Sequence, residues 1–239
     1  MMVWFMEGMC FLPTFLVIWS SSTFIVSYII ALFQQDVDVI LPYISDTGAT
    51  PPESCVFGFM STITAFSAFA TMYAEYKFVE RIHENTGAVS PHLNKASFAV
   101  GIISCVGMCF VATFQETSVV SVHDFGALLF FIFGAIYAVT QCVISYRGRP
   151  YGSSTAVCHV RAFFAALAVI AVFPTIFCAV NVGTSKLHWN SDDKDYTLHL
   201  VSVAFEWITT FSFVFFFLTY IREFQQFTLK MTVKLTECL

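Results

Sequence analysis

Charged residues are scarce in this sequence. Asp, Glu, Lys and Arg together make up 11% of its 239 residues, against about 25% in a typical soluble domain. Apolar residues reach 57% and include 29 Phe. A water-soluble fold of this size would have to expose much of that apolar surface to solvent. The composition therefore excludes an ordinary soluble domain and indicates a chain whose surface faces hydrocarbon.

Charges are absent altogether from five long stretches. These stretches lie between Glu7 and Asp36, Glu53 and Glu75, Lys95 and Glu116, Asp124 and Arg147, and Arg161 and Lys186. Each holds about 20 residues or more, the length that a helix needs to cross roughly 30 Å of hydrocarbon. A sixth apolar stretch, from Tyr196 to Ile221, is interrupted only by His199 and Glu206. The strands of a membrane barrel would alternate polar and apolar residues, and these runs do not.

The sequence thus predicts an all-α integral membrane protein, a bundle of six transmembrane helices that forms a single domain over residues 1–239. We expect the spans near residues 9–33, 55–76, 97–115, 123–146, 160–182 and 197–221. The first span follows neither a basic segment nor a small-residue cleavage site, so we expect it to be retained and not removed as a signal peptide. In the third span Ser97, Gly101, Cys105 and Cys109 recur every four residues, which predicts close contact with another helix.

Basic residues divide unevenly between the two ends of such a bundle. If the helices alternate in direction, nine Lys and Arg, Arg161 among them, fall at one end and only Lys186 and Lys194 at the other. The positive-inside rule then places both termini in the cytosol. The opposite, lumenal end carries nine Asp and Glu against those two lysines. The basic residues are spread thinly along the helix ends, so we expect no nucleic-acid partner.

Motifs that carry catalysis or metal binding are missing. There is no C-x-x-C pair and no serine nucleophile motif or spaced metal signature, so we expect a protein that is not an enzyme and has no metal or cofactor. Asp46-Thr47-Gly48 resembles half of an aspartic protease site, which needs two carboxylates. Its single copy is better explained as a turn. Cys55 and Cys178 fall near the lumenal ends of their spans, where a disulfide is one alternative and small apolar packing the other.

Ionisable side chains gather on the predicted lumenal side. They are Asp46, His123, Asp124, His188, His199 and Glu206. Glu206 follows His199 by two helical turns, on the same face and about 10 Å deeper, where an ionisable group is costly and is a functional hypothesis by default. Such a cluster is able to bind a metal, relay protons or anchor a lipid headgroup. The alternative for His123 and Asp124 is that they are interfacial caps, and we favour it. The alternative for Glu206 is a buried acid hydrogen-bonded to Ser or Thr of another span, and we give it the same weight as a functional role.

Several blocks of sequence carry a resemblance to a known family. The most specific is LPYISDTGATPPESCVFGFM, from Leu41 to Met60; the others are FLPTFLVIWSSSTFIVSYIIA, VATFQE, VHDFGALL, KLHWNSDDKDYTLHLVSVAFEW and FFFLTYIREFQ. Together they resemble the damage-regulated autophagy modulator (DRAM) family over essentially the whole chain, and the first paralogue more than the longer-tailed second. The family-motif loop consists of Pro42, Tyr43, Ile44, Ser45, Asp46, Thr47 and Gly48.

The resemblance implies a lysosomal multi-pass membrane protein that is induced by DNA damage, promotes autophagy and links it to programmed cell death. The partners expected on this basis are membrane lipids and other lysosomal membrane proteins. Two classes of function stay open: a regulator that binds lipids or proteins, which we prefer, and a lumenal lipid-modifying enzyme or proton-coupled carrier. Clustering of Asp46, His123, His199 and Glu206 around one cavity would favour the second class.

Overall fold

The computed structural model describes residues 8–183 and 186–230, and within them it is built from helices alone. The six long helices are α1 (Phe11–Gln34), α2 (Glu53–Thr86), α3 (Pro91–Thr113), α4 (Val120–Arg147), α5 (Thr155–Asn181) and α6 (Tyr196–Leu218). Two short elements accompany them, the 3₁₀ turn η2 (Asp46–Gly48) and α7 (Ile221–Phe224). All six long helices are long and apolar enough to cross a membrane. The predicted all-α membrane fold is confirmed.

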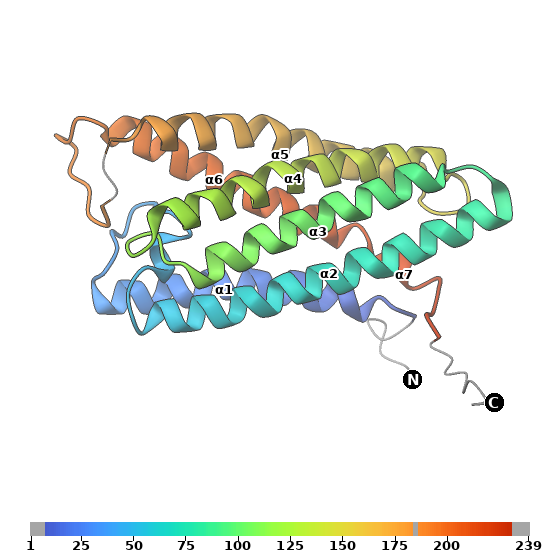
Figure 1. Ribbon diagram of the computed structural model, residues 1–239, viewed down its shortest axis with the longest axis horizontal. Helices are drawn as coiled ribbons and strands as arrows, with labels where there is room; N and C mark the ends of the chain where they lie inside the picture. Colours follow the sequence, from blue (N-terminus) through green and yellow to red (C-terminus); the bar gives the residue numbers. More distant parts are fainter. Residues whose placement is uncertain (1–7, 184–185, 231–239) are drawn as a thin grey trace, which may run out of the picture.

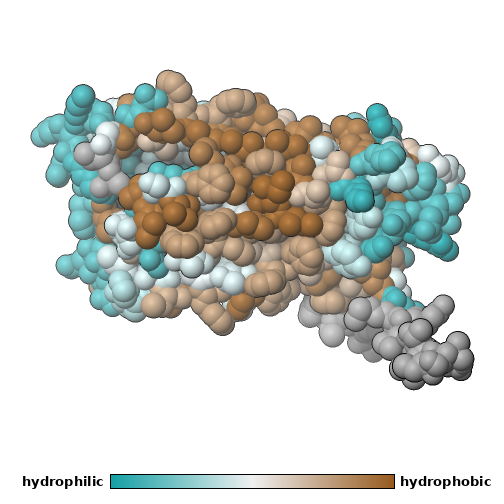
Figure 2. Space-filling view, viewed as in Figure 1, coloured by the Kyte–Doolittle hydropathy of each residue, from teal (hydrophilic) through white to brown (hydrophobic). Residues whose placement is uncertain are grey.

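The helices lie side by side and alternate in direction, so that α1 begins and α6 ends at the same end of the bundle (Figure 1). Each helix packs on the next one along the chain, and α6 packs back on α1, which closes the ring. Apolar residues cover the middle of the visible face, with hydrophilic residues at both ends (Figure 2). We call the end formed by residues 35–52, 114–119 and 182–195 the acidic end, and the end formed by residues 87–90, 148–154 and 219–230 the basic end.

Helix α2 runs well past the predicted span, which ended at residue 76. It continues to Thr86 and stops where Gly87 adopts a positive φ of 67°, a conformation that favours glycine. The added turns carry Lys77 and Arg81, each paired with a glutamate three residues later. Charge-free stretches mark only the part of a helix that lies in hydrocarbon, so they understate a helix that continues into the polar layer.

Helices α3 and α4 approach each other closely, as the small-residue stripe of α3 predicts. A Cβ atom added to Gly107 would lie 2.5 Å from the backbone N of Phe130 and 2.6 Å from the carbonyl O of Gly126. One added to Gly101 would lie 2.5 Å from Met72 Sδ on α2. Gly107 lets the backbones of α3 and α4 touch, and Gly101 leaves room for side chains of α2 and α4; small residues are the usual device where helices meet in a membrane.

Arg161 is not the cytosolic surface charge that the sequence suggested. Its side chain is completely buried, because α5 begins at Thr155 and so places it inside the bundle. Its Nη2 donates to Glu223 Oε2 on α7 at 2.8 Å, its Nε donates to Thr219 at 3.0 Å, and its guanidinium lies 4.3 Å from the ring centre of Tyr220. The ion pair fastens α7 to the bundle at its basic end.

The disulfide alternative for Cys55 and Cys178 does not hold. Both thiols are free, the first exposed and the second buried.

Candidate functional site

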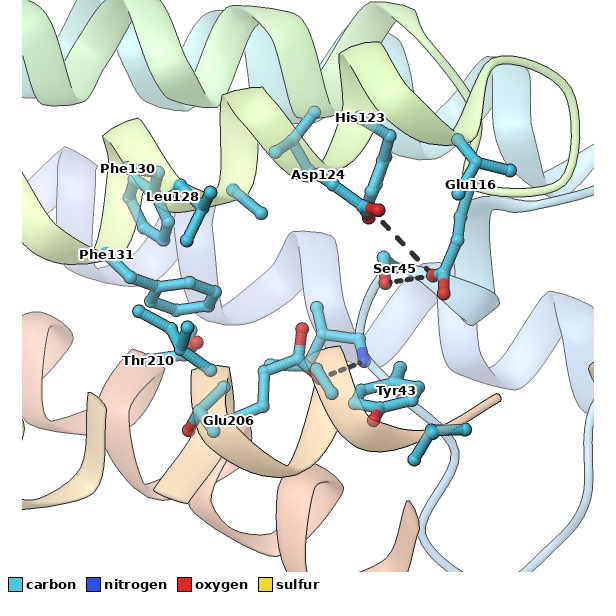
Figure 3. A pocket seen from close by; sticks show the side chains of 18 of the residues that line it. Tyr43, Ser45, Glu116, His123, Asp124, Leu128, Phe130, Phe131, Glu206 and Thr210 are labelled. Atoms are coloured by element: carbon cyan, nitrogen blue, oxygen red, sulfur yellow. Dashed lines mark hydrogen bonds and ion pairs between the residues drawn. The ribbon is translucent and has the colours of Figure 1, made fainter. Parts of the chain in front are cut away.

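A cavity of about 390 Å³ lies toward the acidic end of the bundle, and all six long helices and the segments that follow α1, α3 and α5 contribute to its lining. Figure 3 shows its two halves: Leu128, Phe130 and Phe131 of α4 gather on one side, and Glu116 and Tyr43 lie on the other. This volume lies within the range of small-molecule sites, which are typically apolar with a few fixed polar groups.

Glu206 is the deepest carboxylate of the cavity and is 7% exposed. Its Oε2 accepts a hydrogen bond from the backbone N–H of Ile44 at 2.9 Å, so its partner is the family-motif loop and not a hydroxyl of another helix. The neighbouring Trp207 donates from its indole to the carbonyl of Pro42 at 2.9 Å. Two adjacent residues of α6 therefore hold the loop against the bundle, while no hydrogen bond within the described residues occupies Glu206 Oε1.

The loop itself is fixed by short polar contacts. Thr47 donates to the carbonyl of Ile44 at 2.7 Å and lies 2.9 Å from the hydroxyl of Ser27 on α1. Gly48 packs under Phe57, whose ring would lie 2.5 Å from an added Cβ. The prediction of a turn at Asp46-Thr47-Gly48 is confirmed, since the three residues form η2.

Asp46 and Glu116 form an acid pair at the cavity wall, in which Glu116 lines the cavity and Asp46 lies behind it. The Asp46 side chain is 3% exposed and hydrogen-bonded to Glu116, which also accepts from the hydroxyl of Ser45 at 2.6 Å. Burial raises the pKa of Asp46 well above its usual range, and the neighbouring Glu116 and Glu206 carboxylates add to the effect. Two carboxyl groups in contact favour sharing one proton.

His123 and Asp124 line the cavity and do not cap α4, whose N-terminus has no side-chain cap. The buried His123 places Nδ1 2.8 Å from the carbonyl O of Phe114 and Nε2 4.0 Å from Glu116. A carbonyl only accepts, so Nδ1 carries the hydrogen. Asp124 is exposed and reaches the mouth of the cavity. The cap interpretation of these two residues is wrong because their side chains turn toward the cavity and the 114–116 segment.

His188 and His199 lie outside the cavity lining. His188 is exposed, with Nδ1 3.0 Å from Asp38. The His199 ring stacks on Trp189, with centroids 4.4 Å apart, and meets the Tyr43 ring edge-on at 5.0 Å. Of the six candidate residues, three therefore line the cavity and Asp46 lies behind its wall. The two histidines contact residues of segment 186–195 or of the segment that follows α1. No group of three His, Cys, Asp or Glu in the described part of the chain is placed to hold a metal ion.

Sequence reasoning missed several residues of this site. From the sequence, Glu116 is only one of the nine lumenal acids, although it ends the VATFQE block, one of the blocks that carry the family resemblance. Lys186 also lines the cavity, but its Nζ is 2.7 Å from Asp193 and 4.8 Å from the Trp189 ring centre. The hydrogen bond from Lys186 lowers the pKa of Asp193. This lysine is thus neutralised within its own loop.

Comparison with known proteins identifies the family of this chain. The family described as Frag1/DRAM/Sfk1/Cwh43P N-terminal domain matches residues 8–227. DNA damage-regulated autophagy modulator protein 1 of Mus musculus is 46% identical over 236 residues, 99% of each chain, and that of Homo sapiens is 45% identical over 98% of each. Modulator protein 2 of Mus musculus is 43% identical over 98% of this chain and 90% of its own. No solved structure matches. The chain belongs to the Frag1/DRAM/Sfk1 family.

Proposed function

We propose that this protein is a regulator of autophagy in the lysosomal membrane, that it links DNA damage or other stress to programmed cell death, and that it acts by binding a membrane lipid in the acidic-end cavity. Relatives at 46% and 43% identity are named as DNA damage-regulated autophagy modulators, which supports the autophagy role. Lysosomal placement and the link to cell death follow from the family resemblance. Other lysosomal membrane proteins are further proposed partners.

The cavity is the observation that carries the lipid-binding proposal. Its apolar wall is made of helix surface that faces the inside of a membrane-spanning bundle, and its ionisable groups other than Glu206 lie toward the acidic end. A lipid has the same division between chain and headgroup. Sites with an apolar wall and a few polar groups at one end suit such amphiphiles.

The proposed orientation puts the acidic end in the lysosomal lumen and both termini in the cytosol. With Arg161 buried in an ion pair, the basic end still holds most of the Lys and Arg of the chain, against Lys186 and Lys194 at the acidic end. The positive-inside rule supports this orientation without Arg161.

A lipid-modifying enzyme or proton-coupled carrier is the competing proposal. His123 lies near Glu116, and Glu206 shares their cavity, which is the clustering that general acid–base chemistry would need. His199, however, lies outside the cavity lining, packed between two aromatic rings. The hydroxyl of Ser45 donates to Glu116 and not to a histidine, the usual base for a serine nucleophile. The regulator is therefore the proposal that the geometry supports better.

Filling the cavity tests the lipid-binding regulator. Ala127 lines the cavity, whereas Ala99 of α3 is exposed outside it. In cells that lack the chain, we expect Ala127→Trp to fail to restore turnover of autophagosome cargo after DNA damage, and Ala99→Trp to restore it, with both variants at equal amounts in lysosomes. Full restoration by Ala127→Trp would show that the cavity is not needed for the regulation.

A further inference from the structure

We propose that the acidic-end cavity binds a single-chain amphiphile whose headgroup is a cationic amine, with the ammonium held by Glu206 and Asp124. This inference rests on the proposed lipid-binding function and specifies its ligand. Its basis is the charge of the groups that line the cavity, the free acceptor on Glu206, and the position of the cavity opening.

The ionisable groups that line the cavity are mainly acids. Glu116, Asp124 and Glu206 are its acids, and His123 and Lys186 are its bases. Lys186 is already paired with Asp193 outside the cavity, and His123 is directed at Glu116 and the Phe114 carbonyl. A phosphate or carboxylate headgroup would meet repulsion here, whereas an ammonium group would meet attraction.

The acceptors are arranged to receive donors. Glu206 is more than nine-tenths buried, and its Oε1 has no hydrogen bond within the described residues while Oε2 holds the Ile44 amide. Asp124 contributes a second carboxylate from α4, with its side chain in the cavity (Figure 3). A carboxylate is an acceptor only, and an ammonium group offers three donors. Charge-assisted bonds of this kind are about twice as strong as neutral ones, so an amine fits these carboxylates better than a hydroxyl headgroup does.

Part of the cavity lining reaches the outer, hydrocarbon-facing surface of the bundle. Three apolar residues that line it also lie on its outer surface, Val120 at 43%, Leu128 at 37% and Val180 at 76% exposure. They belong to the start of α4 and the end of α5. The proposed route for the ligand is between these helices, so that it enters from the membrane.

The polar and apolar halves of the cavity follow one another in the same order as the headgroup and chain of a lipid in the leaflet at the acidic end. Asp124 lies in the first turns of α4, and Phe131 lies about two turns deeper. An amphiphile that enters sideways keeps its headgroup at the membrane surface and places its chain against Phe130 and Phe131. About 390 Å³ accommodates one chain in part, and the remainder of a ligand would extend through the opening into the bilayer.

Photocrosslinking of the full-length protein in phosphatidylcholine nanodiscs tests the headgroup. Three probes carry the same photoactivatable alkyl chain: sphingosine, N-acetyl-sphingosine, which has lost the charge, and lysophosphatidic acid, which is anionic. We expect sphingosine to label α4 and α5 about tenfold or more above the other two, the effect of one charge-assisted hydrogen bond. Changing the ligand and not the protein avoids any question of folding.

Variants then assign the effect to the carboxylates. Glu206→Gln and Asp124→Asn keep side-chain shape and replace one carboxyl group each by an amide that cannot ionise against the ammonium, and we expect each to reduce sphingosine labelling about tenfold. Asp38→Asn is the matched control, since Asp38 is an acid at the same end that pairs with His188 outside the cavity. It should leave labelling unchanged.

The outcomes separate this inference from the proposed function. Equal or stronger labelling of α4 and α5 by N-acetyl-sphingosine or lysophosphatidic acid would overturn the amine headgroup and leave lipid binding in place. Labelling of α4 and α5 by none of the three probes would count against both. Loss of sphingosine labelling in Asp38→Asn as large as in Glu206→Gln would show a general surface charge effect and overturn the assigned site.

Discussion

The buried ion pair at the basic end gives the sharpest stability prediction. Arg161 is fully buried, and Arg161→Met would remove its bond to Glu223 at 2.8 Å, its bond to Thr219 at 3.0 Å and the contact with the Tyr220 ring. It would also leave Glu223 without its cation and remove a positive charge from the electrostatic surroundings of the buried Glu75. Removing one partner of a buried pair costs about 3–5 kcal/mol. For a chain of this size that corresponds to a fall in melting temperature of about 6–20 °C.

Thermal unfolding in detergent, followed by tryptophan fluorescence, measures this effect. Arg81→Met is the matched control because Arg81 is 71% exposed in its pair with Glu84, and an exposed pair contributes about 1 kcal/mol or less. The double variant Arg161→Met with Glu223→Leu should melt above Arg161→Met alone, since it removes one of the acids left unpaired. A melting temperature of Arg161→Met no lower than that of Arg81→Met would refute the reasoning that the pair holds α7 in place.

Three further predictions concern pH, helix packing and topology. The raised pKa of Asp46 means that the folded protein binds a proton at this carboxyl more tightly than the unfolded chain does, so the stability of the protein should rise as pH falls from neutral toward the unfolded pKa of about 4. Melting curves at several pH values should show a smaller rise in melting temperature for Asp46→Asn than for the unchanged protein. Gly107→Ala forces α3 away from α4 and should cost about 1–3 kcal/mol, whereas Val106→Ala, at a 45% exposed position, should cost less than 1 kcal/mol in the same melts. Protease added outside intact lysosomes should remove tags from both termini, and protection of either tag would contradict the proposed orientation.

The helices were predictable because a membrane imposes a simple rule on sequence. A span must be long and free of charge, and the charge-free stretches from Glu7 to Asp36 and from Asp124 to Arg147 can be found by inspecting the sequence alone. The ends were less predictable. Helix α2 continues to Thr86 because its charged turns pair with each other along the helix, and the charge rule has no information about where such a helix stops.

The burial of Arg161 was not predictable from position alone. A basic residue next to an apolar stretch normally lies at the membrane surface, and nothing near it in the sequence indicates a partner. Its partner, Glu223, is 62 residues away on α7. An ion pair between distant helices requires knowledge of which helices are neighbours, and a single sequence does not contain it.

The candidate site was also only partly predictable, because some of its contacts leave a pattern in the sequence and others do not. Glu206 was identified because an acid two turns inside an apolar helix is costly, and depth can be counted at 1.5 Å per residue. Its partner is a backbone amide, that of Ile44, and every residue but proline has one, so no side-chain pattern could have indicated it. His199 lies on the same face of α6, two turns nearer the acidic end, and yet packs between Tyr43 and Trp189 and not in the cavity lining. Periodicity gives the face of one helix, whereas a cavity is space left between several, so the separation of Glu206 from His199 depends on how the 182–195 loop folds over the acidic end.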